Sequence, residues 1–234
     1  MNRAIRITLG SAVIVVLVAC SGSGSSSHPA TTPTPPATSA STSTSGAAPA
    51  TYTSPPATLP VSDVPLTTDP PPWLAPAVLD NGADSARYVT AAGLPYAEEM
   101  LQVHYHAHLD VEVNGKPVTV PLGVGFIVQG TSVTALAPLH THDATGIVHI
   151  ENSVPATFVL GQFFIEWGVR FTPTCLAGYC TGQGKELAVF VNGTRYAGDP
   201  TRLVLAKHQE IAIEYGDAGK LPPPPSSYAF PNGL

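Results

Sequence analysis

The sequence predicts a mainly β protein, a small β-sandwich or open barrel with one short helix. Residues 103–113 alternate between apolar and polar side chains, and two Asn-Gly pairs each follow an apolar run. The chain also contains 21 Gly and 25 Pro among its 234 residues. Short strands separated by Gly and Pro turns are typical of sandwiches and open barrels.

The clearest strand is expected over residues 103–113. A strand places successive side chains on opposite faces, so the apolar odd positions should face the core. The even positions should then form an outward polar face made of His104, His106, His108, Asp110 and Glu112. Asn114-Gly115 follows directly and predicts a tight hairpin, with a returning strand over 117–122.

The other elements are shorter. Further strands are expected over 125–128, 132–137, 146–151, 187–191, 203–206 and 210–215. Asn192-Gly193 repeats the hairpin signal, and the two Val-x-Val-Asn-Gly copies suggest an internal duplication. One helix is expected over 158–167, where Gly168 stands at its end and the apolar residues have helical spacing, namely Leu160, Phe163, Phe164 and Trp167.

Composition divides the chain into a signal segment 1–19, a linker 20–60, a β-rich body 61–220 and a Pro-rich tail 221–234. Residues 21–60 consist mainly of Ser, Thr, Pro, Ala and Gly and contain no charged residue. Such a segment cannot bury a core, so we expect an extended spacer. The body has the length of one ordinary domain. The tail is expected to be unstructured or loosely docked.

Charge and motifs exclude several functions. The chain has 10 Lys and Arg against 16 Asp and Glu, and no basic run, so nucleic acid is not an expected partner. It lacks a nucleophilic Ser motif and a Gly-rich phosphate loop, so no nucleotide or organic cofactor is expected. Charged residues make up 11% of the chain, which favours an extracellular β protein over a cytosolic helical enzyme.

The N-terminus has the three parts of a secretory signal. Arg3 and Arg6 precede an apolar stretch that ends in Leu17-Val18-Ala19-Cys20. The stretch is shorter than the roughly 20 residues of a transmembrane helix, so cleavage is expected. Leu-x-Ala-Cys resembles the bacterial lipobox. This resemblance implies that Cys20 is lipidated and anchors an extracytoplasmic lipoprotein to the cell membrane. An uncleaved signal anchor is the alternative.

Six histidines form two blocks in the body and are the candidate metal ligands: His104, His106, His108, His140, His142 and His149. Two histidines separated by one strand residue face the same side and can share an ion. The first block spans about 13 Å, too far for all three to bind one ion. We therefore expect two ligands from one block and one or two from the other. Zn or Cu is favoured, followed by non-haem iron.

Three functions are consistent with these histidines. The first is capture or buffering of a metal outside the cell. The second is a small metallo-enzyme with an open position for water, in which Glu151 or Asp143 is a candidate general base. The third is a structural or adhesion module whose histidines respond to pH near 6.5, the ordinary histidine pKa. The stripe in the first block could also be the solvent face of an edge strand.

Cys175 and Cys180 are expected to form a disulfide. Four residues separate them in a Gly-containing loop, and the chain is expected outside the reducing cytosol. A pair of free thiols is the alternative. A blue-copper site requires a cysteine ligand, so the disulfide disfavours that kind of site.

Four strings in the body resemble a group of secreted or lipid-anchored bacterial proteins of unassigned function. They are His-x-His-Ala-His-Leu from His104, Leu-His-Thr-His-Asp from Leu139, Gly-Ile-Val-His-Ile-Glu from Gly146 and Leu-Gly-Gln-Phe-Phe-x-x-Trp-Gly from Leu160. The resemblance covers residues 101–216 and implies no catalytic residue. The histidine pattern is also similar to cupin and carbonic-anhydrase sites, but the Glu and Gly of the cupin motif are missing and the body is too short for a carbonic anhydrase.

Overall fold

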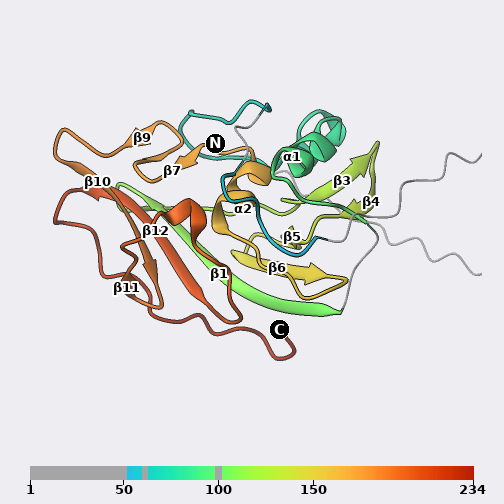
Figure 1. Ribbon diagram of the computed structural model, residues 1–234. Helices are drawn as coiled ribbons and strands as arrows, with labels where there is room; N and C mark the ends of the chain where they lie inside the picture. The colour runs from blue at the N-terminus through green and yellow to red at the C-terminus, as the bar shows by residue number, and fades with distance from the viewer. Residues whose placement is uncertain (1–51, 60–62, 98–101) are drawn as a thin grey trace, which may run out of the picture. The chain divides into compact units, whose positions relative to one another are not determined.

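Seven strands form the central sheet of the fold (Figure 1). They are β1 (Val103–Val113), β2 (Lys116–Val118), β5 (Leu139–His140), β6 (Ile147–Asn152), β10 (Lys185–Val191), β11 (Thr194–Arg195) and β12 (Glu210–Asp217). The strand order is β11-β10-β12-β1-β6-β5, and β2 pairs with β1 in addition. β1 and β12 pair in parallel, while the other neighbours are antiparallel.

This computed structural model describes residues 52–59, 63–97 and 102–234. They belong to the second of the chain's two compact units, which extends over residues 46–234. The predicted signal segment, Cys20 and most of the predicted linker lie outside the described residues. Within the described part of the chain, no helix has the length and apolar character needed to cross a membrane.

Two smaller sheets and two α-helices complete the described fold. One sheet contains β3 (Phe126–Gln129) and β4 (Ser132–Leu136), and the other contains β7 (Phe171–Thr172), β8 (Cys175–Leu176) and β9 (Tyr179–Cys180). The helices are α1 (Ser85–Ala91) and α2 (Leu160–Trp167), and three 3-10 turns span Pro76–Val78, Asp80–Gly82 and Pro200–Arg202. The sheets are not closed, so the predicted class, mainly β and open, is confirmed.

Most strands form where the sequence predicts them. β1 has the expected bounds, and both residues of the Asn114-Gly115 turn have positive φ, as a tight hairpin requires. The returning strand β2 is shorter than expected. Residues 203–206 form no strand, since Val204 makes only an isolated bridge to Val159. Helix α1 was not expected, because its seven residues bury only Ser85, Val89 and Ala91 and carry no clear apolar period.

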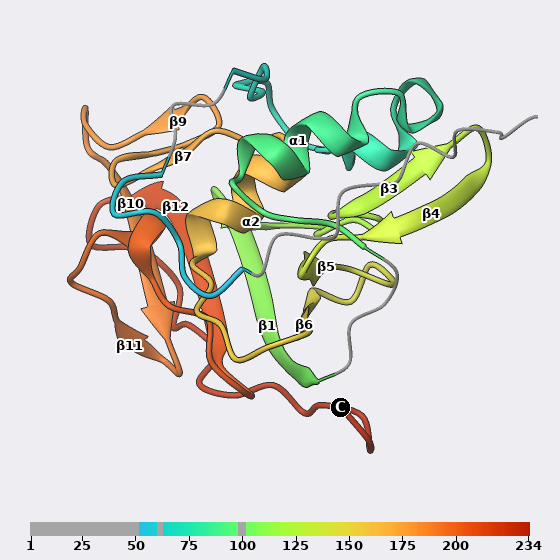
Figure 2. The ribbon, with the colours of Figure 1, turned by 45° about the vertical axis from the view of Figure 1, so that its right-hand side comes forward.

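The apolar face of the central sheet belongs to the hydrophobic core. On β1 the buried apolar side chains include Ala107, Leu109 and Val111, which join one core cluster with the aromatic side chains of α2. Every residue of α2 is buried, and both helices lie on the same side of the central sheet (Figures 1 and 2). The second face of the sheet is therefore the one that carries the polar residues.

The Pro-rich tail covers part of this polar face. The Tyr228 ring stacks on the His108 ring with 3.7 Å between centroids, and Phe230 stacks on His208. The prolines of the tail line a groove with Asp110, Glu112 and Glu214. In the structure the tail is thus docked along the sheet rather than unstructured.

The prediction that the even-numbered side chains of β1 face solvent is wrong at the centre of the strand. The exposed fractions are only 3% for His106 and 4% for His108. The reason is that β1 lies between β6 and β12 in the interior of the sheet, and that side chains of neighbouring strands and the tail cover its polar face. Alternation correctly separated the two faces, but both faces are buried at this point.

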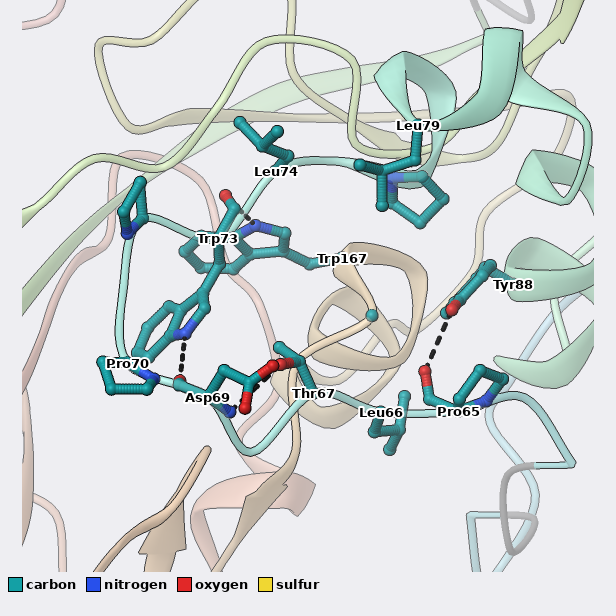
Figure 3. Close-up of a pocket in the computed structure, with 13 residues that line it drawn as sticks. Pro65, Leu66, Thr67, Asp69, Pro70, Trp73, Leu74, Leu79, Tyr88 and Trp167 are labelled. Carbon is teal, nitrogen blue, oxygen red and sulfur yellow. Dashed lines mark hydrogen bonds between the residues drawn. The ribbon is translucent and has the colours of Figure 1, made fainter.

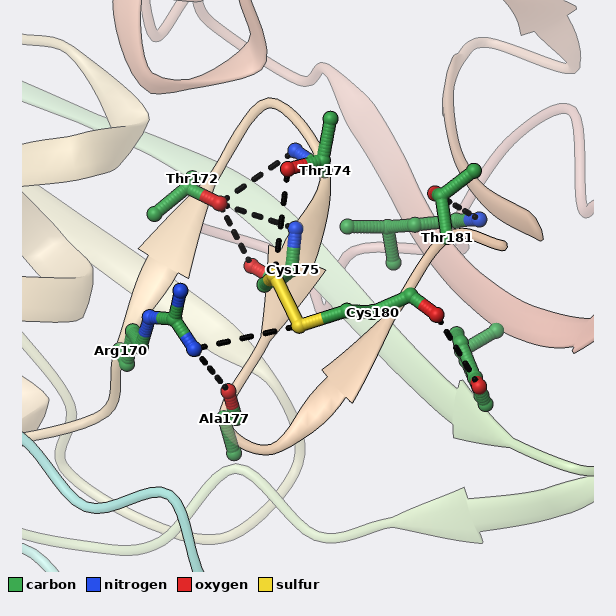
Figure 4. Close-up of a disulfide and its surroundings, with 9 residues drawn as sticks. Arg170, Thr172, Thr174, Cys175, Ala177, Cys180 and Thr181 are labelled. Atoms are coloured by element: carbon green, nitrogen blue, oxygen red, sulfur yellow. Dashed lines mark hydrogen bonds between the residues drawn. A yellow bond between two sulfur atoms is a disulfide. The ribbon is translucent and has the colours of Figure 1, made fainter. Parts of the chain in front are cut away.

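A disulfide joins Cys175 and Cys180 across the β8–β9 pair (Figure 4). The Arg170 side chain reaches toward the Cys180 sulfur and the Ala177 carbonyl oxygen from the neighbouring segment. With both sulfurs bonded to each other, neither cysteine is available as a metal ligand.

Residues 52–59, assigned by composition to the linker, also contact the body, since the Tyr52 ring stacks on Phe158.

Glu214 gives a pH-dependent prediction for the stability of the polar face. It is 4% exposed, and burial together with the charge of Glu112 raises its pKa to about 7. Because the folded-state pKa lies above the unfolded value, the fold holds this proton more tightly, and the resulting stabilisation is lost as pH rises from 4.5 through 7. Glu214→Gln should therefore raise the free energy of unfolding by about 1–2 kcal/mol at pH 8.

Chemical denaturation of the wild type and the Glu214→Gln variant at pH 5 and pH 8 tests this expectation. The gain should shrink strongly at pH 5, where Glu214 in the folded protein is already protonated. An equal gain at both pH values would contradict the burial of an ionised carboxylate as its cause.

Candidate metal centre

Three adjacent strands carry the histidine cluster. The sheet places β6 between β1 and β5, and its register sets His106 opposite His149 and His149 opposite His140. Neighbouring strands lie about 4.8 Å apart, so the three imidazoles form a row across the sheet. One step along the same face, His104 is set opposite Glu151. The sheet therefore brings together the two histidine blocks that are separate in the sequence.

The ring nitrogens of the two His-x-His pairs are close to each other. The Nε2 atoms of His104 and His106 are 3.1 Å apart, and those of His140 and His142 are 3.0 Å apart. His106 Nε2 is also 3.1 Å from His149 Nδ1. In a tetrahedral zinc site with Zn–N bonds near 2.0–2.1 Å, two ligand atoms are about 3.3 Å apart. Each pair is thus close to the spacing that one ion requires.

The Glu151 carboxylate lies among these rings. Its Oε1 atom is 3.2 Å from His104 Nε2, 3.5 Å from His149 Nδ1 and 3.8 Å from His140 Nε2. Burial raises the pKa of Glu151, but the hydrogen bond to His149 and the charges of His140 and His104 outweigh it and lower the pKa. Oε2 is buried and has no hydrogen-bond partner among the described residues. An ionised carboxylate with a free buried oxygen suits a metal ligand.

Two overlapping groups have their ligand atoms within 4.8 Å of one another. The first contains His140, His142, His149 and Glu151, and the second contains His104, His106 and His149. In each group the buried histidine of the His-x-His pair lies beside an exposed one. These groups can hold a metal ion at distances normal for imidazole and carboxylate ligands.

No protein-family model, characterised protein or solved structure matches the chain. The chemistry of the site must therefore be argued from its own geometry.

The orientation of His140 is set by the backbone. Its fully buried ring places Nδ1 2.8 Å from the carbonyl oxygen of Ala137. A carbonyl oxygen only accepts, so Nδ1 carries the proton, and the lone pair of Nε2 points toward His142. Burial lowers the pKa of His140 to about 4. The ring is thus neutral at pH 7, the state in which histidine binds a metal.

His106 is also held neutral. Burial and the neighbouring rings of His149 and His104 lower its pKa to about 4. Its Nδ1 atom is buried and has no hydrogen-bond partner in the described part of the chain. Its Nε2 atom faces two imidazoles, and a ring nitrogen cannot donate to one neighbour and accept from the other. A cation at this point would instead bind the lone pairs of all three rings.

His108 belongs to a third group, with Asp110 and Glu210, whose ligand atoms also lie within 4.8 Å of one another. Its Nδ1 is 2.9 Å from Glu210 Oε2, and its Nε2 is 2.9 Å from the Thr145 carbonyl oxygen. Burial lowers the pKa of His108, but the contacts with Glu210, Thr145 and Asp110 outweigh it and raise the pKa. Burial also raises the pKa of Glu210, although its hydrogen bond with His108 opposes this shift. With acceptors at both nitrogens, the geometry favours an imidazolium over a metal ligand.

Asp143 is poorly placed to act as a general base. Its Oδ1 accepts hydrogen bonds from the backbone N–H and the hydroxyl of Thr145. These hydrogen bonds lower the pKa of Asp143. The Asp143 carboxylate is thus a weaker base than an ordinary one. Glu151, the second candidate base, lies instead within ligand distance of the histidines.

The partners of His108 are the residues that sequence reasoning missed. Glu210 is 102 positions away in the sequence, and Tyr228 belongs to the tail. Glu210 could be placed only by knowing that β12 pairs in parallel with β1, which no local pattern indicates. By contrast, the sequence alone identified the five converging histidines and Glu151 as candidates.

A separate pocket of about 460 Å³ lies near helix α1 (Figure 3). It is lined mainly by apolar and aromatic side chains, including Trp73, Tyr88 and Trp167. Both tryptophans are almost fully buried, with exposed fractions of 3% and 1%, and their indole N–H groups donate to backbone carbonyl oxygens. Their ring faces are therefore used by the core, and none of the histidines of the cluster lines this pocket.

Proposed function

We propose that this protein is a cell-envelope lipoprotein that captures or buffers a transition-metal ion, Zn(II) or Cu(II), outside the cell. The observation that carries the proposal is the convergence of five imidazoles and one carboxylate on one face of the central sheet, namely His104, His106, His140, His142, His149 and Glu151. The ring nitrogens lie 3.0–3.1 Å apart, close to the spacing that two ligands of one ion require.

The donor set supports these two metals. Neither group contains a cysteine, and both body cysteines are in a disulfide, so neither of these two cysteines can be a thiolate ligand. Imidazole with a carboxylate oxygen suits Zn(II) and Cu(II). The buried rings of His106 and His140 are held in place, and the ring of His140 is further fixed by its Nδ1 hydrogen bond. Such fixed ligands cost little conformational entropy when an ion binds.

Partial exposure of the cluster supports capture and release. His104 and His142 are exposed, whereas His106 and His140 are buried. An ion can therefore reach the site from solvent through the exposed ring of each pair. The same exposure favours a metallo-enzyme as the second candidate, because it leaves room for a water on the ion. Assays of carbonate hydration and ester hydrolysis by the metal-loaded protein distinguish the two.

Elemental analysis tests the proposal directly. The full-length chain is purified in detergent without a polyhistidine tag, loaded with Zn(II) or Cu(II) and dialysed against metal-free buffer. We expect at least one ion to remain per chain for one of the two metals. His28→Ala, which removes a histidine of the linker, is the matched control and should retain as much metal as the wild type. A chain that retains neither metal would overturn the proposal.

The membrane anchor is tested separately by Cys20→Ala. If the cysteine of the lipobox-like segment carries the lipid, the variant should move from the membrane fraction to the soluble fraction. Its metal content per chain should stay unchanged, because residue 20 is far in sequence from all ligands. Cell fractionation with elemental analysis of both fractions provides the measurement. A variant that stays in the membrane would favour an uncleaved signal anchor.

A further inference from the structure

The histidine cluster consists of two similar halves. On β1, the buried His106 and the exposed His104 form one His-x-His pair, with 3.1 Å between their Nε2 atoms. At β5, the buried His140 and the exposed His142 form the other, with 3.0 Å between their Nε2 atoms. The centroids of the two rings are 4.7 Å apart in both pairs. Each half therefore provides two ligand atoms at the spacing of a single ion.

Strand β6 lies between the two halves and carries two further ligands. The His149 ring is 4.4 Å from the His106 ring and 4.5 Å from the His142 ring, and nearly perpendicular to both. Glu151 Oε1 reaches His104 of one pair at 3.2 Å and His140 of the other at 3.8 Å. His149 and Glu151 thus contact both halves of the cluster.

The number of ligand atoms exceeds what one ion uses. A tetrahedral ion takes four ligands, and a catalytic or exchanging ion takes three with a water. If one ion used a His-x-His pair together with His149 and Glu151, the other pair would keep its two nitrogens at 3.0–3.1 Å without an ion. The two overlapping groups together contain six ligand atoms, which is enough for two ions with three protein ligands each.

We propose that the cluster holds two transition-metal ions side by side, one on each His-x-His pair, with His149 and Glu151 between them. His104, His106 and His149 hold the ion on the β1 side, and His140, His142 and Glu151 hold the ion on the β5 side. This inference rests on the proposed function, because it assumes that the cluster binds a transition metal.

Electrostatics predicts how the two ions bind. Two divalent cations at short distance repel each other, so the second ion binds more weakly than the first. The Glu151 carboxylate lies between the two halves and reduces this repulsion. Its Oε2 atom, which has no hydrogen-bond partner among the described residues, is available to the neighbouring ion. We therefore expect two successive binding events of unequal affinity.

Calorimetric titration of the full-length chain with Zn(II) and Cu(II), combined with elemental analysis, tests the inference. The variants replace only the exposed histidines, His104→Gln and His142→Gln, so the buried packing is retained. The wild type and His28→Ala should bind two ions, and each variant should lose one of the two binding events. A wild type that binds one ion, lost in both variants, would overturn the inference and leave the proposed function standing. No binding at all would overturn both.

Electron paramagnetic resonance of the wild type provides a second test that needs no variant. With one equivalent of Cu(II), the spectrum should be that of an isolated ion. With two equivalents, two copper ions a few ångströms apart should couple, and the integrated signal should be broadened and fall below two spins per chain. Two full, uncoupled signals at two equivalents would show that the second ion binds elsewhere and would overturn the inference.

Discussion

Replacing His149 by Ala is expected to remove the ion held on the β1 side of the cluster. His149 is the one residue shared by both ligand groups within the described part of the chain, and its Nδ1 lies 3.1 Å from His106 Nε2. Its loss leaves the pair His104–His106 with only two ligands, fewer than a stable zinc or copper site has, whereas His140, His142 and Glu151 remain on the β5 side. Elemental analysis after dialysis should show that the variant retains about half the metal per chain that the wild type retains.

The fold should survive this substitution. The His149 side chain is 13% exposed and lies on the polar face of β6, while Val148 and Ile150 on the opposite face belong to the core. The circular dichroism spectrum of the metal-free variant should therefore match that of the metal-free wild type. His28→Ala serves again as the control that removes one histidine. Full retention of metal by a folded His149→Ala protein would show that the cluster is not the binding site.

Gly125→Ala is expected to be the most damaging small substitution for the fold and the site. Gly125 has φ +73°, and a Cβ atom at this position would lie 2.0 Å from the Leu139 carbonyl oxygen and 3.0 Å from the Cβ atom of His140. The clash can be relieved only if the backbone moves, either at Gly125 or in β5, which carries His140. We expect a loss of about 2–4 kcal/mol in unfolding free energy, together with weaker metal binding.

Gly130 offers a matched control for this prediction. It also has positive φ, +62°, but a Cβ atom there would meet nothing within 4 Å. Gly130→Ala therefore keeps the backbone strain and lacks the clash, and should cost only about 1 kcal/mol. Chemical denaturation and metal titration of both variants measure the difference. If the two variants lost the same stability, the backbone conformation would explain the loss, and the contact with Leu139 would have no role in it.

The sequence predicted the elements that depend on local patterns. Strict alternation defined β1 with its observed bounds, and the spacing of Leu160, Phe163 and Trp167 indicated α2. The candidate ligands were also visible, because two His-x-His pairs in one body are unusual. The sequence further indicated that all three histidines of the first block could not bind one ion. In the structure, His108 lies with Asp110 and Glu210 in a separate group, which the sequence did not predict.

What the sequence could not predict depends on contacts between distant segments. Alternation tells which side chains share a face, but not what covers that face, and so the burial of His106 and His108 was missed. The ion pair of His108 with Glu210 follows from a strand pairing across about a hundred positions. The docking of the tail involves the stacking of Tyr228 on His108 and of Phe230 on His208, and no sequence period indicates these partners.

The parallel pairing of β1 with β12 also determines when the central sheet can be completed. Val103–Val113 emerges from the ribosome about a hundred residues before Glu210–Asp217. Until then, one edge of β1 has no partner, and non-local pairing of this kind forms slowly. The central sheet therefore cannot be completed until nearly all of the chain has emerged. A truncation before residue 210 would leave β1 as an open edge prone to aggregation.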